Sequence, residues 1–170
     1  MTDMKAPDVL AFLDMVDEKG VRIWLDGGWA VDALLGRQTR KHDDLDIVIE
    51  ERNLDLIADT LRTQGYGLSR RNDTRPWNFA LGDARGREVD FHVVVLDEKG
   101  DGIYGPPENG ELYPAEALTG FGSIKGRAVA CITPEWLVKF HVGYEPDDDD
   151  RADVAALCAK FGIPLPPGFR

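Results

Sequence analysis

Residues 25–49 read LDGGWAVDALLGRQTRKHDDLDIVI and combine a glycine turn, a short helical pattern, a basic loop and an acidic strand. The apolar run that ends at Leu25 predicts a buried strand, and the pair Gly27-Gly28 predicts a tight turn that a ligand can approach closely. The apolar spacing after the turn predicts a short helix over 29–35. The free N–H groups and positive dipole end of that helix suit a bound phosphate, although a Gly-Gly pair alone is also typical of an ordinary turn.

Basic side chains follow this helix closely, at Arg37, Arg40 and Lys41. Guanidinium and ammonium groups are the side chains that neutralise a triphosphate. We therefore identify Arg40 and Lys41, together with Gly27 and Gly28, as candidate nucleotide-binding residues. A short basic loop is equally typical of a solvated surface, so the sequence leaves both interpretations open for the two basic residues.

Two acidic residues, Asp44 and Asp46, open the next predicted strand. Side chains two residues apart leave the same face of a strand, so these carboxylates converge, whereas Leu45 and Ile47 leave toward the core. Two such charges repel each other unless a cation lies between them, and Mg²⁺ prefers carboxylate and phosphate oxygens. An isolated Asp-x-Asp would favour acids that simply face water, but the glycine turn before this pair favours a metal site.

A later strand, predicted over 88–96, alternates polar and apolar residues and places Glu88, Asp90 and His92 on one face. If it pairs beside the first acidic strand, three carboxylates meet, as in a two-metal site for phosphoryl or nucleotidyl transfer. We expect Asp90 to be the third metal ligand and the general base, with Glu88 and His92 as alternative bases. A purely structural role, with one hydrogen bond, is the other interpretation of His92.

The remaining periodicity predicts a mixed α/β or α+β domain built on one central sheet. Helical spacing or strand-like alternation is found over 7–19, 53–63, 66–70, 77–81, 121–124, 127–132, 133–142 and 151–160. Residues 97–118 predict an irregular excursion, and Asp147–Asp150 predicts an acidic link before the last helix. We expect a single domain over residues 1–170, with a core of about 1–132 and C-terminal helices over about 133–162.

Composition narrows the classes of function. The chain has 170 residues and a net charge of −11, from 31 acidic and 20 basic side chains. It lacks the basic surface of a general nucleic-acid binder and would instead attract metal ions or amine-bearing small molecules. Cys131 and Cys158 show neither metal-ligand spacing nor a disulfide framework, which indicates a reducing compartment. The acidic first twenty residues and the lack of a long apolar stretch predict no signal peptide, no membrane contact and a cytoplasmic location.

Residues 25–46 resemble the signature of small antibiotic nucleotidyltransferases. This group includes the lincosamide nucleotidyltransferases and the aminoglycoside 2″-nucleotidyltransferases, and it belongs to the DNA polymerase β-like superfamily. Three later pieces, at 89–92, 140–144 and 150–153, resemble the lincosamide enzymes more closely. The short chain agrees with this, since the aminoglycoside relatives usually carry a larger C-terminal helical part. Residues 72–87 and 97–118 match less closely, and we expect them to face the acceptor.

The resemblance implies an α+β nucleotidyltransferase fold, with a central mixed sheet flanked by helices and a short C-terminal helical part. It implies a cleft for ATP and Mg²⁺ in which Asp44, Asp46 and Asp90 hold the metal, while Gly27 and Gly28 lie against the triphosphate. A hydroxyl of the acceptor would attack the α-phosphorus and release pyrophosphate. The implied acceptor is a small cationic antibiotic, with a lincosamide favoured over an aminoglycoside.

A second class of function stays open, namely a nucleotidyltransferase-type antitoxin or a module that binds or modifies a partner protein. A minimal antitoxin would usually lack the long loop that follows the Asp90 strand, so this loop favours the enzyme. The sequence leaves a homodimer, the preferred nucleotide base and the modified hydroxyl open.

Overall fold

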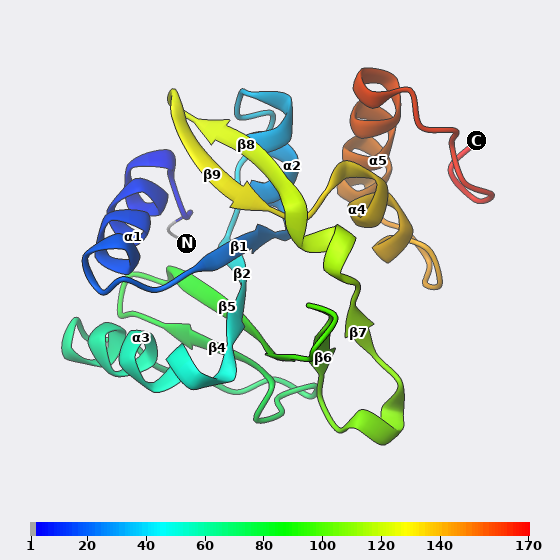
Figure 1. Ribbon diagram of the computed structural model, residues 1–170. Coiled ribbons are helices and arrows are strands. Elements are labelled where there is room, and N and C mark those ends of the chain that lie inside the picture. The colour runs from blue at the N-terminus through cyan, green and yellow to red at the C-terminus, as the bar shows by residue number, and fades with distance from the viewer. Residues whose placement is uncertain (1–2) are drawn as a thin grey trace.

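One mixed β-sheet runs through residues 3–170, the part of the chain that the computed structural model describes (Figure 1). Its strands are β1 (Ile23–Asp26), β2 (Asp44–Glu50), β3 (Gly67–Ser69), β4 (Asn78–Gly82), β5 (Glu88–Leu96), β6 (Gly102–Tyr104), β7 (Leu112–Tyr113), β8 (Gly120–Ile124) and β9 (Arg127–Cys131). The main order is β3-β4-β5-β2-β1-β9-β8, and β6 and β7 extend the sheet from β5. The pairs β2–β5 and β1–β9 are parallel, whereas the other paired strands are antiparallel.

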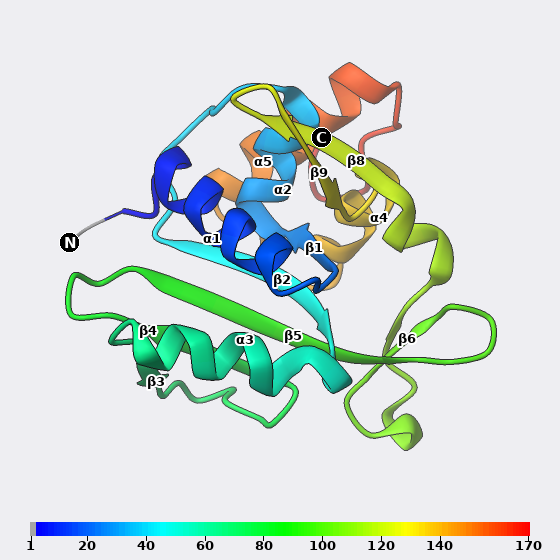
Figure 2. The same cartoon turned by 60° about the vertical axis from the view of Figure 1, so that its left-hand side comes forward.

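The helices form two groups around this sheet. They are α1 (Ala6–Glu18), α2 (Gly27–Leu35), α3 (Glu51–Thr63), α4 (Pro134–Phe140) and α5 (Asp148–Phe161). Figures 1 and 2 show α1 and α3 side by side, and side chains of both helices line one small cavity. The second group consists of α2, α4 and α5, which pack against one another. The sheet is thus flanked by helices, as we expected.

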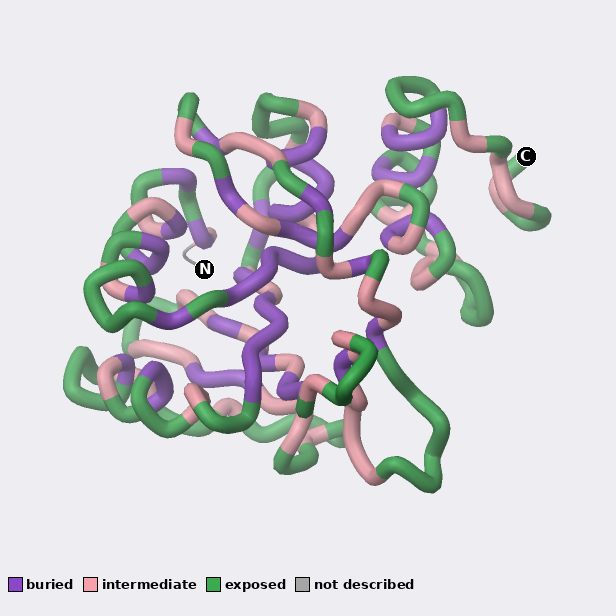
Figure 3. The backbone as a smooth tube through the Cα atoms, viewed as in Figure 1, coloured by how far each residue is buried: buried purple, intermediate pink, exposed green. Residues whose placement is uncertain are grey.

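The buried core lies around the central strands, and β1 is buried along its whole length. Leu45, Ile47 and Ile49 of β2 are fully buried, as is Phe91 of β5. Figure 3 shows the same pattern along the chain, with buried central strands and exposed outer turns of the helices. Burial of one such side chain contributes about 1.5–3 kcal/mol to folding. The alternation therefore places Asp44 and Asp46 on the half-buried face at the start of β2, whereas Val48 and Glu50 further along that face are buried.

The segment 97–118 is more ordered than its composition predicts. The short strands β6 and β7 pair with each other, and β6 also pairs with β5. Two 3₁₀ turns, Pro107–Asn109 and Ala115–Thr119, complete the segment. The prediction of an irregular excursion is wrong for these strands, because the pairing depends on the long β5 strand beside them and not on local periodicity.

The acidic run 147–150 belongs to the last helix and is not a link before it. Asp147 is the N-cap of α5, and its Oδ1 accepts a hydrogen bond of 2.8 Å from the backbone N–H of Asp150. In return, Oδ2 of Asp150 accepts a hydrogen bond of 3.0 Å from the backbone N–H of Asp147. Acidic residues are favourable at this position because they satisfy free N–H groups and the positive helix end.

Among residues 3–170, no helix combines the length and the apolar character needed to cross a membrane.

Candidate active site

Three neighbouring strands place acidic residues in one row across the sheet. Asp26 of β1 is the partner of Asp46 on β2, and Asp46 is the partner of Asp90 on β5. Partners in neighbouring strands point to the same face, so the row faces one side of the sheet. The structure brings Asp44, Asp46 and Asp90 together, with one carboxylate oxygen of each within 4.8 Å of the others. The pairing of the two acidic strands is therefore confirmed, while the role of the acids stays a prediction.

The electrostatics of these acids fit a divalent cation. Burial and repulsion by Asp46 raise the pKa of Asp44 to about 8. Burial also raises the pKa of Asp46, although a hydrogen bond to His92 opposes the rise. Carboxylates that lie this close repel one another unless a cation lies between them. Hard carboxylate oxygens are also the ligands that Mg²⁺ prefers. The residues present therefore fit a magnesium site.

The glycine turn brings the start of α2 against these acids. The helix begins at Gly27, two residues earlier than the spacing predicts, and Asp26 caps it by accepting a bond of 2.9 Å from the Gly27 N–H. Gly27 has a φ of +58°, and a Cβ at this residue would collide with the Asp46 carboxylate. A Cβ at Gly28 would lie 2.5 Å from Nδ1 of His42. Both glycines are thus required by close contacts within the chain itself, and their approach to a triphosphate stays a prediction.

The basic loop is attached to the C-terminal helix. Nη2 of Arg40 lies 3.0 Å from Oδ2 of Asp153 on α5, whereas Lys41 is exposed. His42 is buried, and its Nε2 lies 2.6 Å from Oδ2 of Asp32 on α2. The ion pair of Arg40 and the buried His42 hold the loop in place. Phosphate contacts by Arg40 and Lys41 stay a prediction.

His92 links the acids to an aromatic wall. Its Nε2 lies 3.2 Å from Oδ1 of Asp46, and its Nδ1 lies 3.3 Å from the Tyr104 hydroxyl. Burial lowers the pKa of His92, but the bond to Asp46 and the nearby Asp26 carboxylate outweigh it and raise the pKa to about 9. Both ring nitrogens are therefore engaged, more than the single bond that we expected for a structural histidine.

A cavity of about 500 Å³ opens beside Asp26. Its lining is mainly apolar and includes four aromatic side chains, Tyr104, Tyr113, Trp136 and Phe140. The Tyr113 hydroxyl donates a hydrogen bond of 2.8 Å to Oδ2 of Asp26. The rings of Tyr113 and Phe140 pack edge to face, with their centroids 5.3 Å apart. Both tyrosines come from the segment 97–118.

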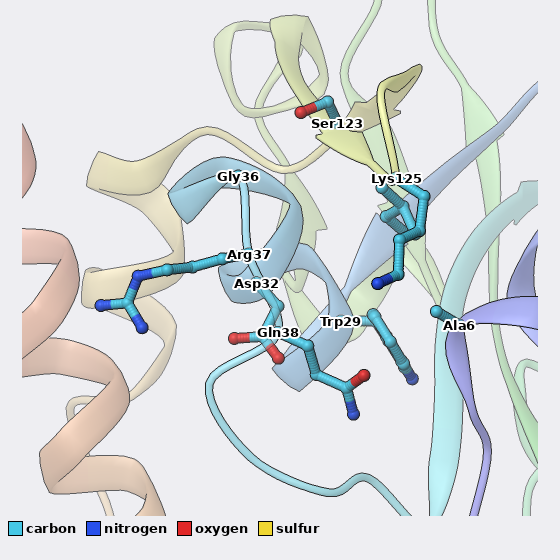
Figure 4. A pocket seen from close by; sticks show the side chains of 9 residues that line it. Ala6, Trp29, Asp32, Gly36, Arg37, Gln38, Ser123 and Lys125 are labelled. Carbon is cyan, nitrogen blue, oxygen red and sulfur yellow. The ribbon is translucent and has the colours of Figure 1, made fainter.

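A second cavity, of about 350 Å³, lies at the other end of α2 (Figure 4). Its walls include Trp29, Arg37 and Lys125. Figure 4 shows Lys125 pointing toward Trp29, whereas Arg37 points away. This cavity does not include the three carboxylates.

The sequence interpretation missed Asp26 and Arg71. Asp26 precedes the two glycines and forms part of the cavity wall. Nη1 of Arg71 lies 2.9 Å from Oδ1 of Asp90. In the sequence, Arg71 is indistinguishable from Arg70 and Arg75, because only the sheet register brings one of these arginines over the acids.

Comparisons with known proteins place these observations in context. A family model described as aminoglycoside-2''-adenylyltransferase matches residues 8–157. A lincosamide resistance protein of Staphylococcus haemolyticus is 29% identical over 150 residues, which cover 88% of this chain and 92% of that protein. A 2''-aminoglycoside nucleotidyltransferase of Escherichia coli is 57% identical over 47 residues, which cover 27% of each chain.

Solved structures show the same fold. The lincomycin-bound lincosamide antibiotic adenylyltransferase LnuA superposes with a TM-score of 0.82 at 27% identity, covering 96% of this chain and 100% of that one. The complex of ANT(2")-Ia with adenylyl-2"-tobramycin gives a TM-score of 0.70 at 22% identity, covering 92% and 89%. The predicted α+β nucleotidyltransferase fold is confirmed.

Proposed function

The chain belongs to the aminoglycoside-2''-adenylyltransferase family, and from this membership we propose that it transfers AMP from ATP to a hydroxyl of a small amine-bearing antibiotic. The convergence of Asp44, Asp46 and Asp90 beside the start of α2 is the observation that carries this proposal. The site adjoins a cavity large enough for a small acceptor. Family membership supports a nucleotidyltransferase, and the finer roles below are part of the proposal.

Each residue has a part in this reaction. Asp44, Asp46 and Asp90 would hold Mg²⁺, which supplies charge neutralisation for the triphosphate and alignment of the attacking and leaving oxygens. Gly27 and Gly28 would present the start of α2 to the phosphates. The acceptor oxygen bonds to the α-phosphorus while the bond from the α-phosphorus to the bridging oxygen breaks, and pyrophosphate leaves.

The proton of the attacking hydroxyl needs an acceptor within the site. Asp90 is our first candidate, because its side chain lies in the acidic row and is 13% exposed. Glu88 and His92, on the same face of β5, are the alternatives, and the raised pKa of His92 makes it the poorer proton acceptor of the two. Arg40 and Lys41 would add positive charge on the triphosphate side, provided that Arg40 leaves its ion pair with Asp153.

The lining of the cavity favours a lincosamide over an aminoglycoside. An aromatic wall suits an acceptor with an apolar part, because apolar surface gains by leaving water. Asp26 and Glu111 add acidic groups that suit an amine. The net charge of −11 also supports a cationic small molecule over a nucleic acid. The same cavity favours the enzyme over a module that only binds a partner protein, since such a module needs no acceptor pocket.

The test is pyrophosphate release from MgATP with lincomycin, with tobramycin and without acceptor. We expect release with lincomycin, less with tobramycin, and an antibiotic product that has gained AMP by mass spectrometry. Asp46→Asn should abolish turnover and keep the fold, because it removes a ligand charge at nearly unchanged shape. Release that is independent of every antibiotic in the panel would overturn the proposal. AMP found on a protein instead of the antibiotic would support the partner-modifying alternative.

A further inference from the structure

Arg71 binds the carboxylate that the proposed function assigns as third metal ligand. Its Nη1 lies 2.9 Å from Oδ1 and 3.0 Å from Oδ2 of Asp90, and its Nη2 lies 3.2 Å from Oε2 of Glu88. One guanidinium thus occupies both oxygens of Asp90. A divalent cation requires an oxygen of the same carboxylate, so the two cations compete for it.

The sheet register explains why Arg71 reaches this position. Ser69 at the end of β3 is the partner of Ala80 on β4, and Ala80 is the partner of Asp90 on β5. Arg71 follows Ser69 by two residues, and the short side chain of Ala80 leaves a path across β4. The backbone N–H of Arg71 donates a bond of 2.7 Å to the Thr74 hydroxyl, which holds the turn.

The surroundings of Arg71 allow it to leave. Its side chain is 38% exposed, whereas that of Asp90 is 13% exposed. The guanidinium can therefore rotate into water while Asp90 stays in the site. Arg75, in the same turn, donates hydrogen bonds to the backbone oxygens of Asn72 and Thr74. Its guanidinium therefore stabilises the turn and forms no ion pair with Asp90.

We propose that Arg71 changes partners during substrate binding, neutralising Asp90 in the free protein and binding the triphosphate when nucleotide and metal enter together. This inference rests on the proposed function. A guanidinium and a divalent cation repel each other at short range, so the metal must displace Arg71 from Asp90. A triphosphate carries more charge than a carboxylate, and its oxygens also accept hydrogen bonds from a guanidinium. Metal alone then binds weakly, and nucleotide and metal strengthen each other's binding reciprocally.

The experiment measures Mn²⁺ binding to the full chain by the electron paramagnetic resonance signal of free Mn²⁺, with and without a non-hydrolysable ATP analogue. The variant is Arg71→Met. The control is Arg70→Met, which removes the same charge from an exposed side chain that forms no ion pair within residues 3–170. Because charge-assisted hydrogen bonds are lost, we expect Arg71→Met to tighten Mn²⁺ binding without nucleotide about tenfold and to weaken analogue binding about tenfold. The control should change neither by more than about twofold.

Each result has a defined meaning. Mn²⁺ affinity that Arg71→Met leaves unchanged or lowers would overturn the competition. A tighter Mn²⁺ site with unchanged analogue affinity would overturn the transfer to phosphate. Arg71→Lys keeps the charge without the planar fork and should lie between wild type and Arg71→Met, which provides a second variant if Arg71→Met unfolds. Failure of the proposed function gives a separate result. In that case Asp46→Asn would leave Mn²⁺ binding equal to that of the wild-type chain.

Discussion

The substitution Asp44→Asn should stabilise the metal-free protein while abolishing catalysis. Asp44 forms no ion pair within residues 3–170, and its carboxylate lies within 4.8 Å of those of Asp46 and Asp90. Two full charges 4.8 Å apart repel by about 3.5 kcal/mol at an effective dielectric constant of about 20. Proton uptake and the nearby Arg71 relieve most of this repulsion, so we expect a net gain of about 1–2 kcal/mol from the neutral amide.

The assay is thermal unfolding in a chelator and again with saturating Mn²⁺. In chelator, Asp44→Asn should raise Tm by about 2–8 °C, because one kcal/mol corresponds to about 2–4 °C in a chain of this size. Mn²⁺ should raise Tm of the wild type and raise that of the variant much less, since a ligand charge is missing. The Asp44 carboxylate would therefore lower the stability of the metal-free protein and also be required for activity.

Asp43→Asn is the matched control, because Asp43 is the neighbouring residue and is exposed. It removes the same charge and should leave Tm and the response to Mn²⁺ unchanged. A lower Tm for Asp44→Asn in chelator would refute the electrostatic reasoning. Equal stabilisation of the wild type and Asp44→Asn by Mn²⁺ would refute the assignment of Asp44 as a ligand.

Four further predictions follow from single contacts or from the arrangement of the chain. Gly27→Ala should lower the free energy of unfolding by roughly 1–3 kcal/mol in urea, because residue 27 has a φ of +58° and its Cβ would meet a carboxylate; an unchanged midpoint would contradict this. Tyr113→Phe should cost about 1 kcal/mol of stability, through loss of the bond to the helix-capping carboxylate, and should raise KM for the antibiotic more than KM for ATP. Burial raises the pKa of Asp32, but hydrogen bonds from His42 and Thr39 outweigh it and lower the pKa below 3.8, so this group contributes stability that is lost as pH falls through the lowered value. Asp32→Asn should therefore flatten the stability profile in that acid range, as measured by fluorescence-detected unfolding. Calorimetry of the full chain should show one cooperative transition if residues 1–170 form one domain, whereas two transitions would separate the C-terminal helices from the core.

The short-range parts of the site could be predicted from the sequence. The two-residue period of a strand places Asp44 with Asp46, and Glu88 with Asp90 and His92, whatever the rest of the chain does. The apolar residues between them are fully buried at Leu45 and Ile47, which agrees with that period. The glycine pair likewise indicates the turn before α2, although the helix begins two residues earlier than its spacing predicts. Backbone geometry alone determines such features, so neighbouring residues suffice to predict them.

Contacts between distant segments were decided only by the tertiary structure. The sequence could state what would follow if the two acidic strands paired, but the parallel register that sets Asp46 beside Asp90 depends on the packing of the whole sheet. The same register brings Arg71 onto Asp90, and the folding of 97–118 brings Tyr113 to Asp26. These contacts join residues 19 to 87 positions apart, and no local period encodes them. Their free energy comes from many weak interactions summed over the folded chain, which is why three similar arginines in one turn have different surroundings.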